Sequence, residues 1–229
     1  MFAYAKLSVM TLLGVSEAAE RLGVSTRRVQ HLVASGHLRQ VARGVVDEAS
    51  VERLLAVRGA SHVRAWSELT AWGAVAILSG AEADWMGERQ RARLRARLRT
   101  ITAGDLVERA RNRAVVARYR AHPSSGRHLR AEIVHAAGLA GRLGLAETNA
   151  VDGYLAAKDV SGVVRRHGLM RDDEGRVTLR ATTVDLDIVH DLIDRGTVLA
   201  ALDLAESLDV RERRAGLDAI GDVLEGFRG

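Results

Sequence analysis

The stretch that decides the fold lies between residues 14 and 46 and reads GVSEAAERLGVSTRRVQHLVASGHLRQVARGVV. Its first part, residues 16–23, predicts a short helix, because Ser16 can cap the N-terminus and Gly23 can end the helix. Residues 25–36 predict a second helix, for which Ser25 is the cap. Two short helices therefore follow each other with almost no connection between them.

The residues that follow predict a small β element and a third helix. Residues 38–41 and 45–46 are expected to form short strands around Arg43 and Gly44, which favour a tight turn. Asp47 can cap the third helix. Apolar residues recur on that helix at helical spacing, namely Val51, Leu54 and Leu55.

The second helix has one apolar side and one polar side. Packing between the first two helices is expected from Ala18, Ala19 and Leu22 on the first and from Val29, Leu32 and Val33 on the second. Arg27 and His31 then point nearly opposite the apolar side, with Arg28 and Gln30 beside them. A helix whose polar face points outward, and whose N-terminus faces the DNA, fits the major groove of the duplex.

Candidate DNA contacts follow from this arrangement. Ser25 and Thr26, with the free N–H groups of the first helical turn, suit a phosphate. Arg43, at the tip of the β element, would reach the adjacent backbone or the minor groove. The complete expected set is Ser25, Thr26, Arg27, Arg28, Gln30, His31 and Arg43.

Charge is distributed unevenly along the 229 residues, which carry a formal net charge of +5. Residues 1–60 have net charge +3, residues 61–130 have +8, and residues 131–229 have −6. Arginine abundance alone is weak evidence, because a GC-rich coding sequence produces it. The asymmetry is better evidence, and it favours nucleic acid as a partner of the front half.

Several functions are not expected for this sequence. It contains no cysteine, which excludes disulfides, thiolate zinc sites and cysteine nucleophiles. It has no apolar run of membrane-spanning length and no signal peptide, so we expect a cytoplasmic protein without membrane contact. No nucleotide-binding, hydrolase or zinc-protease motif occurs, and we expect no enzymatic activity, no metal and no cofactor. Asp185, in Asp185-Leu186-Asp187, is interpreted as a helix cap.

The expected fold class is mainly α, of the α+β type, in three domains. Residues 10–58 form the first, residues 61–122 a helical middle domain, and residues 126–229 an α+β domain with a small hairpin. Helices are expected over residues 83–99, 105–121 and 129–137, with a linker at residues 122–126. The hairpin is expected to join residues 169–171 to residues 177–181. Trp66, Trp72 and Trp85 are interpreted as core residues.

Arginines alternate along the helix expected over residues 83–99. They stand at positions 89, 91, 93, 95, 97 and 99. Steps of two residues are 200° apart on a helix, so these side chains are expected to surround it. Two interpretations remain open, a phosphate-binding arm beside the main DNA contact and an ordinary solvated helix.

The N-terminal pattern resembles the excisionase and MerR-type winged helix-turn-helix. The residues that carry the resemblance are VSEAAERLGVS at 15–25, then Arg28-Val29 and SGHL at 35–38. The resemblance implies a DNA-binding domain with a β wing, which here is shorter than usual.

A second resemblance involves the C-terminal stretch VLAALDLAES at 198–207 and RERRAGL at 211–217. Together with the N-terminal pattern it is similar to antitoxins of the AbiEi type. Those are winged-helix proteins paired with nucleotidyltransferase toxins in bacterial phage-defence operons. The resemblance implies repression of the protein's own operon and neutralisation of a toxin.

The function expected from the sequence is therefore sequence-specific DNA binding for transcriptional repression, with an antitoxin role implied by the second resemblance. The expected partners are an operator with repeated half-sites, a homodimer mate on DNA, and a toxin. Two alternatives remain open. One is an excisionase-like accessory that bends DNA in recombination, against which the large C-terminal half argues. The other is a toxin-binding protein without a DNA role.

Overall fold

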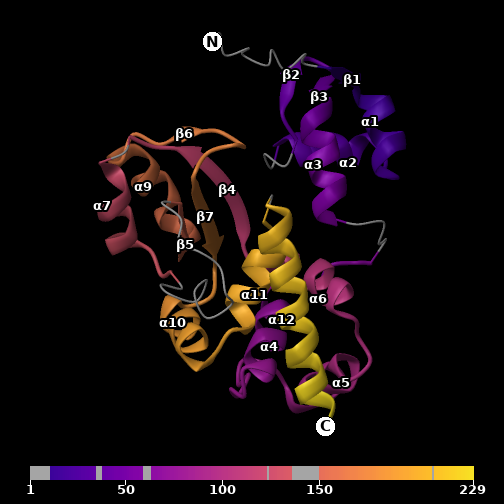
Figure 1. The fold of residues 1–229 in the computed structure, drawn as a ribbon, viewed down its shortest axis with the longest axis vertical. Coiled ribbons are helices and arrows are strands. Elements are labelled where there is room, and N and C mark those ends of the chain that lie inside the picture. Colours follow the sequence, from indigo (N-terminus) through magenta and orange to yellow (C-terminus); the bar gives the residue numbers. More distant parts are fainter. Residues whose placement is uncertain (1–10, 35–37, 59–62, 123, 136–149, 208) are drawn as a thin grey trace, which may run out of the picture. The chain divides into compact units, whose positions relative to one another are not determined.

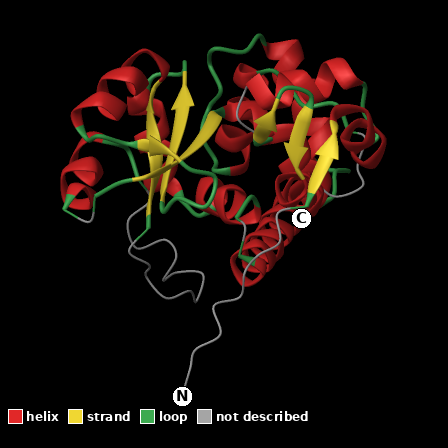
Figure 2. Cartoon of the chain, turned by 90° about the horizontal axis from the view of Figure 1, so that it is seen from above, coloured by secondary structure: helices red, strands yellow, loops and turns green. Residues whose placement is uncertain are grey.

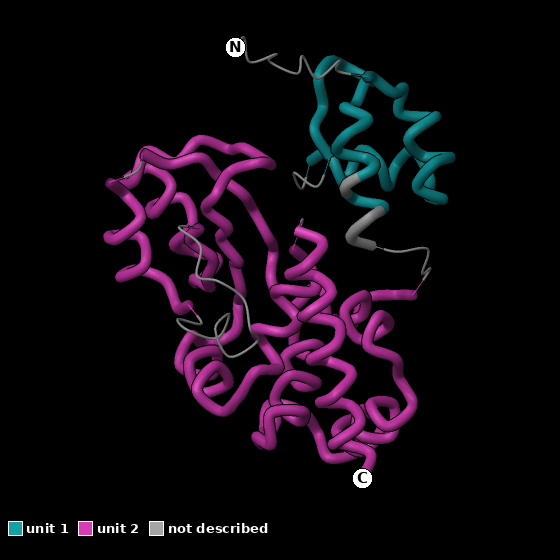
Figure 3. The backbone as a smooth tube through the Cα atoms, viewed as in Figure 1, with its two compact units in different colours: residues 1–60 teal, residues 61–229 magenta. Residues whose placement is uncertain are grey.

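A computed structural model describes residues 11–34, 38–58, 63–122, 124–135, 150–207 and 209–229. Its architecture is mixed α+β, with helices and two small sheets (Figure 1). The chain divides into two compact units, residues 1–60 and residues 61–229 (Figure 3). None of the helices in the described ranges is both long enough and apolar enough to cross a membrane.

Unit 1, residues 1–60, combines a small sheet with helices. The helices are α1 (Val15–Leu22), α2 (Thr26–Ala34) and α3 (Glu48–Arg58), and the strands are β1 (Leu12–Gly14), β2 (Gln40–Ala42) and β3 (Val45–Asp47). The strand order is β1-β3-β2, and both pairs are antiparallel. The tight turn between β2 and β3 depends on Gly44, whose φ of 78° lies in the left-handed region that favours glycine.

The packing predicted between the first two helices is confirmed. Ala18, Ala19, Val29 and Leu32 are buried in the core of unit 1, and Leu22 and Val33 pack against that core. The predicted positions of the helices and of the two strands also agree with the structure to within a few residues, although residues 35 and 36 lie outside the described part. Strand β1 was not predicted, because it pairs with a strand distant in the sequence and has no adjacent turn signal such as Arg43 and Gly44.

Unit 2, residues 61–229, has a helical core. It is built around α4 (Glu68–Leu78), which is buried on almost every side. Packed with it are α5 (Glu88–Leu98), α6 (Ala103–Ala110), α10 (Leu186–Arg195), α11 (Val198–Ala205) and α12 (Val210–Arg228). Trp72 is fully buried there, and Trp66 and Trp85 are partly buried against the same core. The interpretation of the tryptophans as core residues is therefore confirmed.

A four-stranded sheet forms the other part of unit 2. Its strands are β4 (Val115–Arg120), β5 (Val151–Ala156), β6 (Met170–Arg171) and β7 (Val177–Thr182), in the order β5-β7-β4-β6. Helices lie on both sides of this sheet (Figure 2). One face packs its apolar residues against α7 (Ser125–Glu132) and α9 (Val160–Arg166). The other face is polar and is in contact with α11.

The helix predicted over residues 105–121 is wrong in its second half. Helix α6 ends at Ala110, a single 3₁₀ turn follows (Arg111–Arg113), and β4 then begins at Val115. Strand β4 pairs antiparallel with β7, from Val115↔Ala181 to Tyr119↔Val177. The hydrogen bonds of the sheet and the burial of Tyr119 therefore outweigh the local preference of this segment for a helix.

The predicted hairpin is wrong as well. Strands β6 and β7 do not pair with each other, because β4 lies between them and pairs with both. The turn is present, since Gly175 donates its N–H to the carbonyl of Asp172 at 2.9 Å. It crosses over β4 so closely that a Cβ at Gly175 would lie 2.1 Å from the carbonyl oxygen of Tyr119. The sequence marks the turn but not the strand that passes beneath it.

The segment at residues 122–126, predicted as a linker, lies within unit 2. Residues 61–122 and 126–229, predicted as two domains, form a single compact unit. The physical reason is the shared core, to which α4 and α6 contribute from one side of this segment and α10, α11 and α12 from the other. Helix α7 begins at Ser125, earlier than expected, and residues 136 and 137 of the helix predicted there lie outside the described part.

Aspartates cap two helices of unit 2, and the cap at Asp185 is the one predicted above. The Asp185 carboxylate accepts from the backbone N–H of Asp187 at 3.1 Å, at the start of α10. The Asp209 carboxylate accepts from Arg211 and Glu212 at 2.7 and 3.1 Å, at the start of α12. Asp185 is therefore used as a cap, as interpreted from the sequence.

Candidate nucleic-acid interface

The connection between α1 and α2 is a tight turn. Gly23 ends α1 in the left-handed conformation, with φ of 62°, and the N–H of Val24 bonds back to the carbonyl of Ala19 at 3.0 Å. Ser25 follows, and its Oγ accepts from the backbone N–H of Arg28 at 3.3 Å. This hydrogen bond caps α2, so its direction relative to α1 is set by local interactions.

The predicted contact residues on α2 separate from its apolar side as expected. Thr26, Arg27, Gln30 and His31 are exposed and Arg28 is half-buried, whereas the apolar side of the helix is buried. Ser25 is also exposed, although its Oγ already serves as the cap. The structure thus brings six of the seven predicted contact residues together, with Ser25 just before α2 and the other five on the helix.

Two kinds of arginine occur in this unit. Arg21, on α1, forms ion pairs with Glu48 and Glu52 of α3, and its hydrogen bond lowers the pKa of the Glu48 carboxyl. In the described part of the unit, no carboxylate pairs with Arg27, Arg28 or Arg43. Arg21 therefore serves to hold α1 against α3, while the charges of the other three arginines are not neutralised by a carboxylate.

Arg43 occupies the two-residue turn between β2 and β3 and is exposed. The carbonyl of the next residue, Gly44, accepts from the N–H of Val15 at 3.0 Å, at the beginning of α1. The hairpin is thus attached to the two-helix element by its turn. This hydrogen bond fixes the turn that carries Arg43 to α1, whereas the other six predicted residues lie at α2.

A second charged cluster lies on the polar face of the sheet in unit 2, and the sequence did not predict it. Arg113 is 1% exposed, and all five of its N–H groups have partners. Its guanidinium donates to both carboxylate oxygens of Glu206 at 2.7 and 2.8 Å and to Asp203 at 2.6 Å. The remaining two donors go to the Tyr154 hydroxyl at 3.0 Å and to a backbone carbonyl, that of Ala110, at 3.3 Å.

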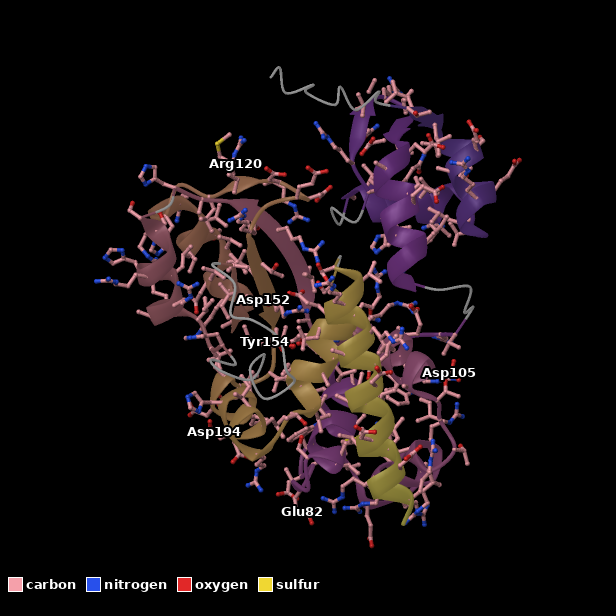
Figure 4. The ribbon with its side chains drawn as sticks, in the orientation of Figure 1. Glu82, Asp105, Arg120, Asp152, Tyr154 and Asp194 are labelled. Atoms are coloured by element: carbon pink, nitrogen blue, oxygen red, sulfur yellow. The ribbon has the colours of Figure 1, made fainter. Side chains whose placement is uncertain are left out.

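Arg180 extends this cluster across the sheet. It donates to both carboxylate oxygens of Asp152 at 2.7 and 2.9 Å and to Glu206 at 3.0 Å. Asp152 and Tyr154, both labelled in Figure 4, lie two residues apart on β5. We call Arg113, Arg180, Asp152, Tyr154, Asp203 and Glu206 the buried ion network, after its two buried arginines; the Asp152 side chain is 43% exposed.

The electrostatics of the buried ion network keep Arg113 charged and Tyr154 protonated. Burial by itself lowers the pKa of Arg113, but the facing charges, led by Glu206, outweigh it and raise the pKa well above its ordinary value. Burial raises the pKa of Tyr154, so its hydroxyl stays protonated and donates to Asp203 at 2.7 Å. Because the network satisfies itself, we interpret it as a structural link between α11 and the sheet.

The only sequence signal for this network is the alternation of the strands. Thr178, Arg180 and Thr182 occupy one face of β7, and apolar residues occupy the other. That pattern places Arg180 on a polar face but does not identify its partners, which lie far away in the sequence. Across the described ranges, no cluster of three or more His, Asp or Glu side chains is arranged to hold a metal ion.

Comparisons of the chain with protein-family models, with curated proteins and with solved structures gave no match. A function must therefore be inferred from the geometry and charge of the two units.

Proposed function

We propose that unit 1 is a winged helix-turn-helix that binds duplex DNA, with α2 as the recognition helix and the β2–β3 hairpin as the wing. The observation that carries this proposal is the arrangement of α2. Its apolar side is packed against α1, and its polar side, with Arg27, Gln30 and His31, is exposed. This is the arrangement that a helix needs in order to be held by a scaffold and read a groove.

The dimensions and chemistry of α2 support the proposal. An α-helix with its side chains is about 10–12 Å in diameter, and the major groove is about 12 Å wide, so a helix such as α2 can enter it. Arg27 can bond a guanine edge with two N–H groups, and Gln30 can bond an adenine edge through its donor and its acceptor. The half-buried Arg28, the first-turn residue Thr26 and the wing residue Arg43 suit phosphates, which fix the register of the helix.

Transcriptional repression is the role that we propose for this binding, since a protein bound at a specific promoter site blocks access to it. One recognition helix covers only a few base pairs. We therefore propose that two copies of the chain bind as a homodimer to half-sites separated by one helical turn, about 34–36 Å.

An antitoxin role is a proposed extension of this function and rests on the resemblance and on charge. Six apolar side chains of α11 and α12 are used within the core of unit 2 and are not offered to a toxin. Leu199, Leu202, Ile220 and Leu224 are buried, and Leu217 and Phe227 pack against the same core. What supports the extension is the net charge of −6 over residues 131–229, which would complement a basic partner.

The test of DNA binding starts from a library of duplexes with random sequence, from which the full chain selects its preferred site. The double variant Arg27→Ala/Arg28→Ala should then no longer shift the selected duplex, since removing a contact to a base costs about 1–3 kcal/mol. Its melting temperature should stay nearly unchanged, because both side chains lie outside the core. A footprint of the wild type should show two half-sites.

The control is Arg195→Ala/Arg214→Ala, which also removes two positive charges but from exposed positions in unit 2. It should leave both the selected site and the affinity unchanged. Undiminished binding by a folded Arg27→Ala/Arg28→Ala variant would exclude α2 from the interface.

A further inference from the structure

Five arginines of helix α5 and Arg99 at its C-cap form two rows, a division that alternation in the sequence did not predict. Arg91, Arg95 and Arg99 follow one another at four-residue steps, and so do Arg89, Arg93 and Arg97. Residues four apart lie on the same side of a helix, so each set forms a row about 12 Å long. We call the first set the paired row and the second set the open row.

Each arginine of the paired row has a partner within unit 2. Arg91 lies 3.0 Å from the Asp84 carboxylate and 3.9 Å from that of Glu82, which is labelled in Figure 4. Arg95 also lies 3.9 Å from Glu82. Arg99 is stacked over the ring of Phe227, with 5.9 Å between its guanidinium carbon and the ring centroid. Each of these arginines has a structural role.

The open row has no such partners. Arg89, Arg93 and Arg97 are all exposed, and nowhere in the described ranges does a carboxylate pair with them. Like charges four residues apart on a helix destabilise it by about 0.2–0.5 kcal/mol for each pair. The open row therefore costs stability and contributes nothing to the packing of α5, which depends on Leu94 and Leu98.

We propose that the open row is a second DNA contact, which binds the phosphate backbone of duplex DNA without reading its sequence. The ligand class follows from charge and spacing. The three guanidinium groups are carried about 6 Å apart along the helix, and one DNA strand presents a phosphate every 3.4 Å of its axis. This inference rests on the proposed DNA-binding function. The open row adds to that binding an affinity that depends strongly on salt.

The experiment compares two double variants of the full chain, Arg89→Gln/Arg93→Gln in the open row and Arg91→Gln/Arg95→Gln in the paired row. Both remove two positive charges from the same helix. Binding of a 30-base-pair duplex of arbitrary sequence is measured by fluorescence anisotropy at several salt concentrations, and thermal melting confirms that each variant is folded.

The open-row variant should flatten the slope of log affinity against log salt by about 1.8, which is about 0.9 for each phosphate that the protein no longer neutralises. The paired-row variant should keep the wild-type slope. An unchanged slope in the open-row variant, or an equal change in both variants, would overturn the proposal. The proposal would also be overturned if the open-row variant lost its binding to phosphatidylserine vesicles and kept its binding to DNA.

Failure of this inference can be distinguished from failure of the proposed function. If Arg27→Ala/Arg28→Ala abolishes site-specific binding while the open-row variant behaves as wild type, only the second contact is wrong. If the open-row variant loses affinity and Arg27→Ala/Arg28→Ala does not, the open row binds DNA and α2 does not.

Discussion

Arginine has opposite roles in the two units. On α2 of unit 1, Arg27 is exposed and no carboxylate in the described part of the chain pairs with it. In unit 2, Arg113 is 1% exposed and uses all five N–H groups on partners within the unit. A guanidinium whose donors are all satisfied cannot bind a ligand without losing those partners, whereas an exposed one without a partner can.

The difference shows that the count of arginines predicts little and that their surroundings decide their role. Desolvation makes a buried charge costly unless it is paired, so Arg113 and Arg180 require Asp152, Asp203 and Glu206. An exposed arginine has no such requirement, and it keeps its charge available to an anion. Mutations in the two units should therefore affect different measurements.

The largest effect is expected from Arg113→Met. The change removes the main partner of Glu206 and Asp203, whose side chains are 13% and 16% exposed, and breaking a largely buried pair in this way costs about 3–5 kcal/mol. Chemical denaturation, followed by a probe in unit 2, measures the loss. Arg195→Ala is the control, since Arg195 forms an exposed ion pair with Asp191, and it should change the unfolding free energy by at most about 1 kcal/mol.

The same variant also compares the stabilities of the two units, because each unit has its own core. Calorimetry of Arg113→Met should show a lower transition for unit 2 and an unchanged one for unit 1. A loss of stability below about 1 kcal/mol would mean that the buried ion network is dispensable.

A smaller effect on unit 2 is expected from Gly175→Ala. The added Cβ would meet the backbone of Tyr119, so the turn or β4 must shift, at a cost of about 1–3 kcal/mol. Gly221→Ala is the matched control, because Gly221 lies inside α12 with open space around its Cβ position. That change should stabilise the protein by about 0.5–1 kcal/mol. Equal effects of the two alanines would contradict the crossing of the turn over β4.

Local patterns were sufficient to predict unit 1 but not the sheet of unit 2. Local signals define α1 and α2, namely the end of α1 at Gly23, the cap of α2 at Ser25, and the spacing of Ala18, Ala19, Val29 and Leu32. The predicted cap at Ser16 is wrong, because α1 already begins at Val15, after Gly14. Strand β4 pairs with β7 about sixty residues later, and its order in the sheet depends on contacts that no local pattern encodes.

The candidate interface could be predicted for a similar reason. All seven residues, from Ser25 to Arg43, lie on two adjacent elements, and a helical wheel is enough to find the exposed side of α2. The buried ion network joins residues up to 93 positions apart, such as Arg113 and Glu206, so it emerges only from the fold. The division of the α5 arginines likewise required the positions of Glu82, Asp84 and Phe227.

The most direct test of the central claim uses the absence of cysteine from the chain. Gln30→Cys introduces a single thiol on α2, which is labelled with a short photo-crosslinker, and a second protein carries the same label at Arg195→Cys in unit 2. If α2 lies in the major groove, the label at position 30 should crosslink to bases within each half-site of the selected duplex, whereas the label at position 195 should not. Crosslinks from position 30 that are absent, or that match those from position 195, would contradict the assignment of α2 as the recognition helix.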